Sequence, residues 1–252
     1  MSEILRLESV GRSFGAVKAL SDVSFSVNAG EVVALCGDNG AGKSTLIRII
    51  SGADRPSEGS LFFNSEAVCF SSPAQALARG IATTYQDLAL APEMKLYENV
   101  FMGAELTRKS LIPGIRILDK KRMKKQALEY LSRLKARMTD PEVRINTLSG
   151  GQRQAVAISR ALRWEARLVI MDEPTAALGV QETQGVLDLI CQLRHQGVTV
   201  LLVSHTMEDI VAVADRAVIL KGGKKVGECA CRNLDPRDLG QMIMTGEVQQ
   251  RA

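Results

Sequence analysis

Nine consecutive residues near the N-terminus have the types and spacing of a phosphate-binding loop. The stretch 37–45 reads GDNGAGKST and fits the pattern G-x-x-x-x-G-K-[ST]. In such a loop the backbone N–H groups surround phosphates, the lysine reaches the terminal phosphates, and the next hydroxyl is placed to bind Mg²⁺. We therefore expect a bound nucleoside triphosphate. The expected contacts are Gly37, Asp38, Asn39, Gly40, Ala41, Gly42, Lys43, Ser44 and Thr45.

The residues on either side of this phosphate loop predict the elements that hold it. Glu31–Leu35 is an apolar run typical of a buried strand, and Ser44–Ile50 has the pattern of a helix that Gly52 closes. The helix N-terminus would direct its dipole and its free N–H groups at the bound anion. The alternative is a glycine-rich turn that only caps a helix, but a strand and a helix in the correct order favour phosphate binding.

Two adjacent carboxylates follow a second predicted strand. Leu168–Met171 is apolar and is followed by Asp172 and Glu173. A carboxylate at the carboxyl end of a parallel strand beside a phosphate loop can hold Mg²⁺. The neighbouring Glu173 can then polarise an attacking water as a general base. Read alone, such a pair is often a helix-capping turn, but the upstream phosphate loop and the following Pro174-Thr175 favour the chemical role.

A third segment, Leu148–Gln152, places a serine and two glycines directly before a predicted helix that includes 154–162. We call Leu148–Gln152 the serine–glycine turn. Its composition is typical of a helix N-terminus that can face phosphate, and the alternative is a plain N-cap with glycines for flexibility.

Together, the phosphate loop, the serine–glycine turn and the Asp172-Glu173 pair resemble the ATP-binding subunit of an ABC transporter. The resemblance extends over nearly the whole chain in the correct order. It implies an α/β fold, with a P-loop NTPase (RecA-like) core, an antiparallel β subdomain and an inserted helical subdomain. It also implies ATP and Mg²⁺ as cofactors, and ATP hydrolysis. In this family the turn completes the ATP site of the other subunit, which implies a homodimer of nucleotide-binding domains or pairing with a related subunit. The turn residues expected at that site are Ser149, Gly150, Gly151 and Gln152.

The resemblance also assigns roles to single residues. Phe14 stands where the family stacks an aromatic ring on adenine, although the usual residue is tyrosine. Gln86 matches a glutamine that touches Mg²⁺ and water, and His205 matches a histidine on the γ-phosphate. Without the resemblance these three would be an ordinary core residue, a surface glutamine and a structural histidine. Gly179 departs from the family, which commonly has an acidic residue there, so no carboxylate contact across the dimer is expected from this position. The resulting sets are Glu173, His205, Gln86 and Lys43 for catalysis, and Ser44, Gln86 and Asp172 for the metal.

The change of residue pattern along the chain predicts one nucleotide-binding domain with an inserted helical segment. Residues 1–86 and 148–252 are expected to form the core, and 87–147 changes to helical periodicity interrupted by prolines. Alternating residues in 3–35 favour antiparallel strands, and Thr199–Val203 favours a buried strand.

Apolar runs, cysteines and charge exclude further classes of function. No window approaches 18 uninterrupted apolar residues. The five cysteines are odd in number and mostly scattered, with Cys229 and Cys231 as the only close pair, and they indicate a reducing compartment. The net charge of +4 argues against a dedicated nucleic-acid binder. A basic cluster, Lys120–Lys125, opens a predicted helix capped by Asp119 and fits either a solvated helix side or a contact with anionic headgroups or an acidic partner.

We therefore expect a peripheral ATPase on the cytoplasmic face of the plasma membrane. It would power an importer through separate transmembrane permease subunits and, indirectly, a periplasmic-type solute-binding protein. Local strings such as Tyr85–Leu90 and Ala176–Val180 resemble the monosaccharide branch, of ribose or fructose type. The alternatives are a soluble ABC ATPase acting in translation or DNA maintenance, an importer ATPase for a non-sugar solute, and a regulatory protein with an inactive site.

Overall fold

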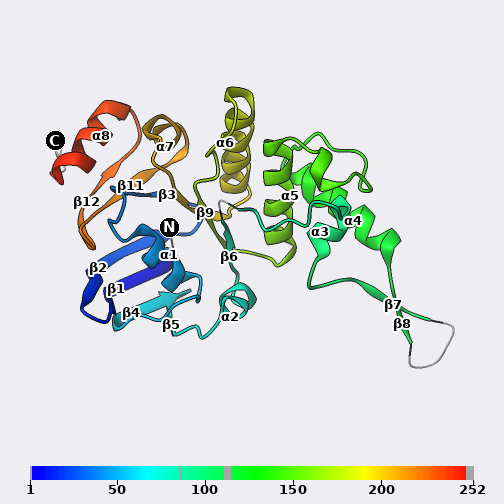
Figure 1. Ribbon diagram of the computed structural model, residues 1–252, viewed down its shortest axis with the longest axis horizontal. Coiled ribbons are helices and arrows are strands. Elements are labelled where there is room, and N and C mark those ends of the chain that lie inside the picture. The colour runs from blue at the N-terminus through cyan, green and yellow to red at the C-terminus, as the bar shows by residue number, and fades with distance from the viewer. Residues whose placement is uncertain (1, 86, 111–114, 248–252) are drawn as a thin grey trace.

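The computed structural model describes residues 2–85, 87–110 and 115–247. Its centre is a six-stranded sheet with the strand order β12-β11-β3-β10-β9-β6 (Figure 1). The pairings that join β6, β9, β10, β3 and β11 are parallel, and β12 is added antiparallel at one edge. The strands are β3 (Val32–Cys36), β6 (Ile81–Thr84), β9 (Leu168–Asp172), β10 (Thr199–Val203), β11 (Arg216–Lys221) and β12 (Lys224–Ala230).

A second, antiparallel sheet covers one face of the central sheet. Its strand order is β2-β1-β4-β5, and α1 (Lys43–Ile50) packs with it and the central sheet in one apolar cluster. This sheet agrees with the strands expected in the first 35 residues. Its strands are β1 (Glu3–Phe14), β2 (Val17–Asn28), β4 (Glu58–Phe63) and β5 (Glu66–Val68), and α2 (Pro73–Ala78) follows them.

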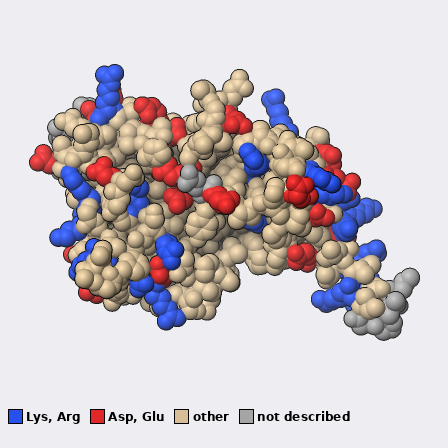
Figure 2. Space-filling model, in the orientation of Figure 1, with Lys and Arg blue, Asp and Glu red and all other residues tan. Residues whose placement is uncertain are grey.

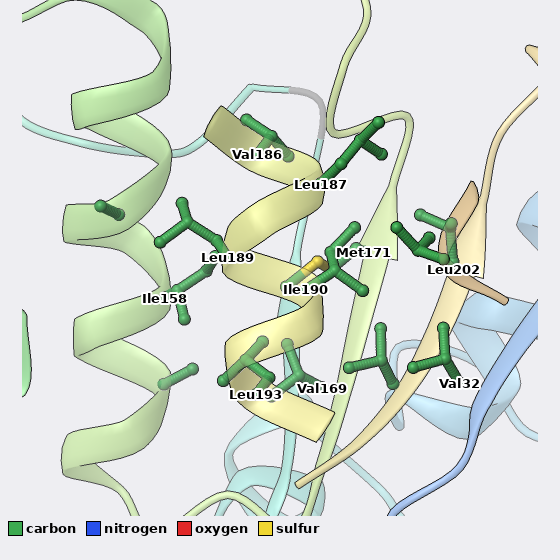
Figure 3. Close-up of a cluster of buried hydrophobic side chains, with 14 of the residues drawn as sticks. Val32, Ile158, Val169, Met171, Val186, Leu187, Leu189, Ile190, Leu193 and Leu202 are labelled. Carbon is green, nitrogen blue, oxygen red and sulfur yellow. The ribbon is translucent and has the colours of Figure 1, made fainter. Parts of the chain in front are cut away.

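The central strands divide the core in two because successive side chains of a strand point to opposite faces. Val33, Leu35 and Ile170 belong to the cluster beneath the antiparallel sheet. Their neighbours Ala34 and Met171 belong to the cluster on the other face, together with α6 (Val180–His195). Figure 3 shows α6 between the strands on one side and α5 on the other. Residues buried on both faces explain why these strands are continuously apolar in sequence.

The segment between β6 and β9 contains a group of helices. In Figure 1 it forms the end of the molecule farthest from the C-terminus. Helix α4 begins after Asp119, whose side chain accepts a hydrogen bond from the Arg122 N–H, as the sequence predicts. The elements here are α3 (Leu96–Phe101), α4 (Lys120–Arg133), the 3₁₀ turn η1 (Ile145–Thr147) and α5 (Gly150–Arg163).

A two-stranded hairpin interrupts this segment, where only helical periodicity is expected from the sequence. Its strands, β7 (Thr107–Lys109) and β8 (Arg116–Leu118), are antiparallel and project away from the body (Figure 1). Lys and Arg side chains gather on the hairpin and on nearby α4 (Figure 2). The residues of both strands are exposed, so no apolar alternation marks them in the sequence.

The last elements close the face of the central sheet that carries α6. Helix α7 (Met207–Val213) packs on α6, and α8 (Pro236–Thr245) packs on α7. Within the described part of the chain, none of the helices combines the length and apolar character needed to cross a membrane.

Candidate functional site

The phosphate loop connects β3 to α1 and requires glycine at two positions. Gly37 has φ +147°, and a Cβ there would lie 2.3 Å from the Leu220 carbonyl oxygen. Gly42 is the N-cap of α1 with φ +103°, and its Cβ would lie 2.6 Å from Leu20 Cδ2. Because β11 and β2 pack this tightly against the phosphate loop, a side chain at position 37 or 42 would displace the loop.

Lys43 is held against the loop that precedes it. Its Nζ donates hydrogen bonds to the carbonyl oxygens of Gly37, at 2.6 Å, and Asp38, at 3.0 Å. Asp38, Asn39 and Gly40 are exposed at the tip of the loop. The ammonium group therefore lies beside an open loop at the N-terminus of α1, where a phosphate would meet both the lysine and the free N–H groups.

Asp172 and Glu173 lie at the carboxyl end of β9, two strands from the phosphate loop in the sheet. Partial burial raises the pKa of the Asp172 carboxyl, the negative charge of Glu173 raises it further, and Lys43 opposes the shift. Because β3, β10 and β9 are parallel neighbours, the carboxyl end of β9 and the phosphate loop after β3 lie at the same edge of the sheet. Carboxylate and hydroxyl oxygens are the ligands that Mg²⁺ prefers, so Asp172 and Ser44 fit a magnesium ion.

His205 and Glu173 form a direct pair. His205 Nδ1 lies 2.6 Å from Glu173 Oε2, and the histidine side chain is 69% exposed whereas the glutamate is 20% exposed. The Glu173 backbone has φ +52°, and its N–H donates to the carbonyl oxygen of Val203, the last residue of β10. This hydrogen bond between the ends of β9 and β10 thus places Glu173 next to His205, which follows β10.

The loop after Glu173 is tied to α7 by a contact that the sequence does not reveal. Thr175 Oγ1 donates to Asp209 Oδ2 at 2.7 Å, and both side chains are buried. These residues are 34 positions apart, and nothing in the sequence around Asp209 indicates that it is the partner of Thr175. The contact fixes the first turn of the loop that leads from Glu173 to Gly179.

The serine–glycine turn begins α5 with Ser149 as the N-cap. Ser149 Oγ accepts from the Gln152 N–H, at 3.4 Å, while Gln152 Oε1 accepts from the Ser149 N–H, at 3.0 Å. This is the capping geometry considered as the plain alternative, and it leaves the turn at the surface. A groove lined by Ser149, Gly151 and Gln152 runs between α5, α6 and the end of α4, and none of its lining residues comes from the phosphate loop.

Of the two remaining predicted contacts, the structure describes Phe14 but not Gln86. Phe14 is not a core residue, because its side chain is 46% exposed and the Arg12 guanidinium lies 4.6 Å from its ring centroid. A flat, exposed ring is what stacking on a base requires. Gln86 lies outside the described residues, so its predicted role stays a prediction.

Arg160 is a residue near this site that sequence reasoning missed. It extends from α5, and its two terminal nitrogens donate to the carbonyl oxygens of Leu88 and Ala89, each at 3.0 Å. Burial lowers the pKa of its guanidinium. Ala89 has φ +47°, so the arginine holds a backbone segment in an unusual conformation two to three residues after Gln86. A lone arginine in a helical pattern carries no signal of such a partner.

The comparison with protein families decides the identity of this arrangement. The model of the ABC transporter family matches residues 20–176, a range that contains the phosphate loop, the serine–glycine turn and the two carboxylates. The chain belongs to the ABC transporter family. The predicted resemblance is therefore confirmed, and with it the P-loop type of α/β fold and the hydrolysis of ATP.

Two relatives resemble this ABC protein over most of both chains. It is 48% identical over 224 residues to the xylose/arabinose import ATP-binding protein XylG of Sulfolobus acidocaldarius, covering 89% of this chain and 87% of the relative. It is 44% identical over 230 residues to the fructose import ATP-binding protein FrcA of Rhizobium meliloti, covering 88% and 86%.

A solved structure of an ATP-binding cassette has the same fold. The dimeric structure of a post-hydrolysis state of the ATP-binding cassette MJ0796, bound to ADP and Pi, superimposes with a TM-score of 0.71 at 27% identity. The similarity covers 92% of this ABC protein and all of that chain.

Proposed function

We propose that this chain is the ATP-hydrolysing subunit of a monosaccharide importer. The observation that carries the proposal is the convergence of the phosphate loop, Asp172 and the Glu173–His205 pair at the carboxyl ends of neighbouring parallel strands. Ligands of open α/β sheets bind at this edge. The choice of a sugar rests on relatives that are named as xylose/arabinose and fructose import proteins.

In this proposal each residue of the site acts on one part of ATP. Lys43 and the N–H groups of the phosphate loop bind the β- and γ-phosphates, and Phe14 stacks on adenine. Ser44 and Asp172, with Gln86, would hold Mg²⁺, which neutralises phosphate charge when it is bound. Glu173 accepts a proton from the attacking water, and His205 contacts the γ-phosphate.

Assembly is the second part of the proposal. Two copies would enclose ATP, each offering its serine–glycine turn to the nucleotide of the other, and permease subunits would receive the resulting motion. The exposed Ser149 and the half-exposed glycines after it support this arrangement, because a partner could reach them. The subunit would sit at the cytoplasmic face of the membrane, with a solute-binding protein on the other side.

The catalytic assignment is tested with Glu173→Gln. The amide cannot act as a base, so kcat for ATP hydrolysis should fall by about 10² to 10⁴ while ATP affinity stays within about twofold. Phosphate release in single-turnover experiments measures the first quantity, and fluorescence titration with an ATP analogue measures the second. Equal turnover by the variant and the parent protein would exclude Glu173 as the base.

The transport assignment is tested on the complex with its permease. We expect membrane subunits to co-purify with the chain, and ATP hydrolysis by the complex in vesicles to rise when a pentose or hexose and the solute-binding protein are present. An amino acid serves as the control solute. Co-purification with ribosomes or DNA instead would favour the soluble ABC ATPase that the sequence leaves open.

A further inference from the structure

One carboxylate lies between the N-termini of two helices. Glu182 is the third residue of α6, and its Oε1 accepts a hydrogen bond from the N–H of Gly150, the first residue of α5, at 2.8 Å. Its Oε2 accepts from the N–H of Gly179, the N-cap of α6, at 3.4 Å. Helix N-termini present unpaired N–H groups and partial positive charge. The carboxylate therefore satisfies one donor of each helix and opposes both dipoles.

The serine–glycine turn also rests on the segment that contains this carboxylate. A Cβ at Gly150 would lie 2.3 Å from Leu178 Cδ2 and 3.3 Å from Glu182 Oε2. A Cβ at Gly151 would lie 3.5 Å from the Glu182 carbonyl oxygen. Gly150 thus permits a close approach that a larger residue would prevent. Two turns of helix farther on, Ile158 faces α6 in an apolar contact (Figure 3).

The position of this carboxylate bears on the missing acidic side chain at 179. Gly179 offers only its backbone, and the nearest acidic group that follows it is Glu182. Both oxygens of Glu182 are engaged within its own protomer, one on the serine–glycine turn and one on the loop that begins at Glu173. In the proposed dimer, the serine–glycine turn and the loop after Glu173 must reach the γ-phosphates of opposite sites. The side chain of Glu182 therefore joins these two segments.

We propose that Glu182 is a positioning residue that fixes the serine–glycine turn to the loop after Glu173. It acts through Gly150 and touches no substrate. Its contribution is to hold the turn in the place where a second copy of this chain can close on ATP. The inference rests on the proposed function, because the turn needs positioning only if it serves the nucleotide of the partner.

The test compares Glu182→Ala and Glu182→Gln with the control Asp188→Asn. Asp188 is an exposed carboxylate on the same helix, bonded only to Gln184 among the described contacts. All variants are made in the Glu173→Gln background, in which ATP is bound but not hydrolysed. Light scattering measures dimer formation against ATP concentration, and fluorescence titration measures ATP affinity of the dilute monomer.

We expect Glu182→Ala to raise the ATP concentration needed for dimerisation by about tenfold or more, as loss of a charge-assisted hydrogen bond predicts. Monomer ATP affinity should stay within about twofold, because Lys43 and its loop are untouched. Glu182→Gln keeps an oxygen acceptor for the Gly150 N–H and should recover part of the loss. Hydrogen exchange at Gly150–Gln152 should be faster in Glu182→Ala than in Asp188→Asn.

Three results would overturn the inference. One is dimerisation of Glu182→Ala at the ATP concentration of its parent. Another is an equal loss of dimerisation and monomer ATP affinity, which indicates general unfolding. The third is failure of the Glu173→Gln parent itself to dimerise with ATP, which would reject the proposed sandwich together with the role of Glu182; in the first two cases the proposed function stands.

Discussion

At the scale of single residues, the surroundings of Asp172 are unfavourable for its ionised carboxylate. Partial burial and the adjacent Glu173 both disfavour its ionised form. A carboxyl whose pKa is raised on folding stabilises the protein only while it is protonated, and this stabilisation is lost as pH rises through the folded pKa. The nucleotide-free protein therefore carries an energetic cost at neutral pH.

Replacing this carboxyl with an amide should remove the cost. We expect Asp172→Asn to unfold at a higher denaturant concentration than the parent at pH 7, in the absence of nucleotide and Mg²⁺. The difference should shrink as pH falls below the raised pKa of Asp172, where the parent is neutral too. Urea unfolding followed by circular dichroism from pH 4 to 8 measures it, with Asp188→Asn as the control. A variant less stable than the parent at every pH would contradict the assignment.

At the scale of elements, α5 connects two functional segments. It begins at the serine–glycine turn, and ten residues later Arg160 holds the carbonyl oxygens of Leu88 and Ala89. A rigid helix between these contacts would transmit a displacement of either segment to the other. In the sequence, the held carbonyl groups follow two and three residues after Gln86, for which contact with Mg²⁺ and water is predicted.

Removing the arginine contact should loosen this segment. Arg160→Met keeps the apolar stem but removes the charged donor from the half-buried Leu88 carbonyl and the exposed Ala89 carbonyl. We expect a loss of about 1–3 kcal/mol in the free energy of unfolding. Amide exchange at 87–90 should quicken, and stimulation of ATP hydrolysis by the permease should fall more than ATP affinity. Arg122→Met, on exposed α4, is the matched control. Unchanged exchange at 87–90 would show that Arg160 does not hold the segment.

Elements with a strong local pattern could be predicted, and those that depend on distant contacts could not. The strands around Val33, Ile170 and Leu201 are continuously apolar because both of their faces are buried. Strand β6 escaped prediction since its four residues, Ile81–Thr84, include an alanine and two threonines. The hairpin strands β7 and β8 lack alternation altogether.

The candidate site likewise contains residues that the sequence predicts and residues that it does not. The phosphate loop and the Asp172-Glu173 pair are contiguous in sequence, so their spacing alone indicates chemistry. Glu182 and Arg160 act through partners 32 and about 71 residues away, and no local pattern announces such contacts. Backbone acceptors and donors are especially hard to foresee, because every residue offers them.

At the scale of the whole molecule, the surface next to Gly179 exposes an apolar side chain to solvent. Val180, the first residue of α6, is 90% exposed although it is β-branched and apolar. In the proposed dimer this loop meets the partner, so burial of Val180 would supply an apolar contact next to position 179, where the family commonly has a carboxylate. This contact should be insensitive to salt, unlike an ion pair.

A charge at this position should oppose dimerisation. Val180→Asp places a carboxylate in the first turn of a helix, which favours the helix itself. We therefore expect normal unfolding but weaker ATP-driven dimerisation, by about tenfold, from the lost burial of a valine side chain. Analytical ultracentrifugation in the Glu173→Gln background measures it, with Met244→Asp as the control, since Met244 is 75% exposed on α8. Equal dimerisation of Val180→Asp and the parent would place this face outside the interface.

The two-sided burial of the central strands has a consequence for heat denaturation. Val33 and Ala34 are adjacent in β3 yet contribute to different apolar clusters, so the loss of that strand would open both at once. Neither apolar cluster can therefore lose its packing while the other keeps its own. Calorimetry should accordingly record a single endotherm, in which the regions that bind nucleotide and those that support them lose order together.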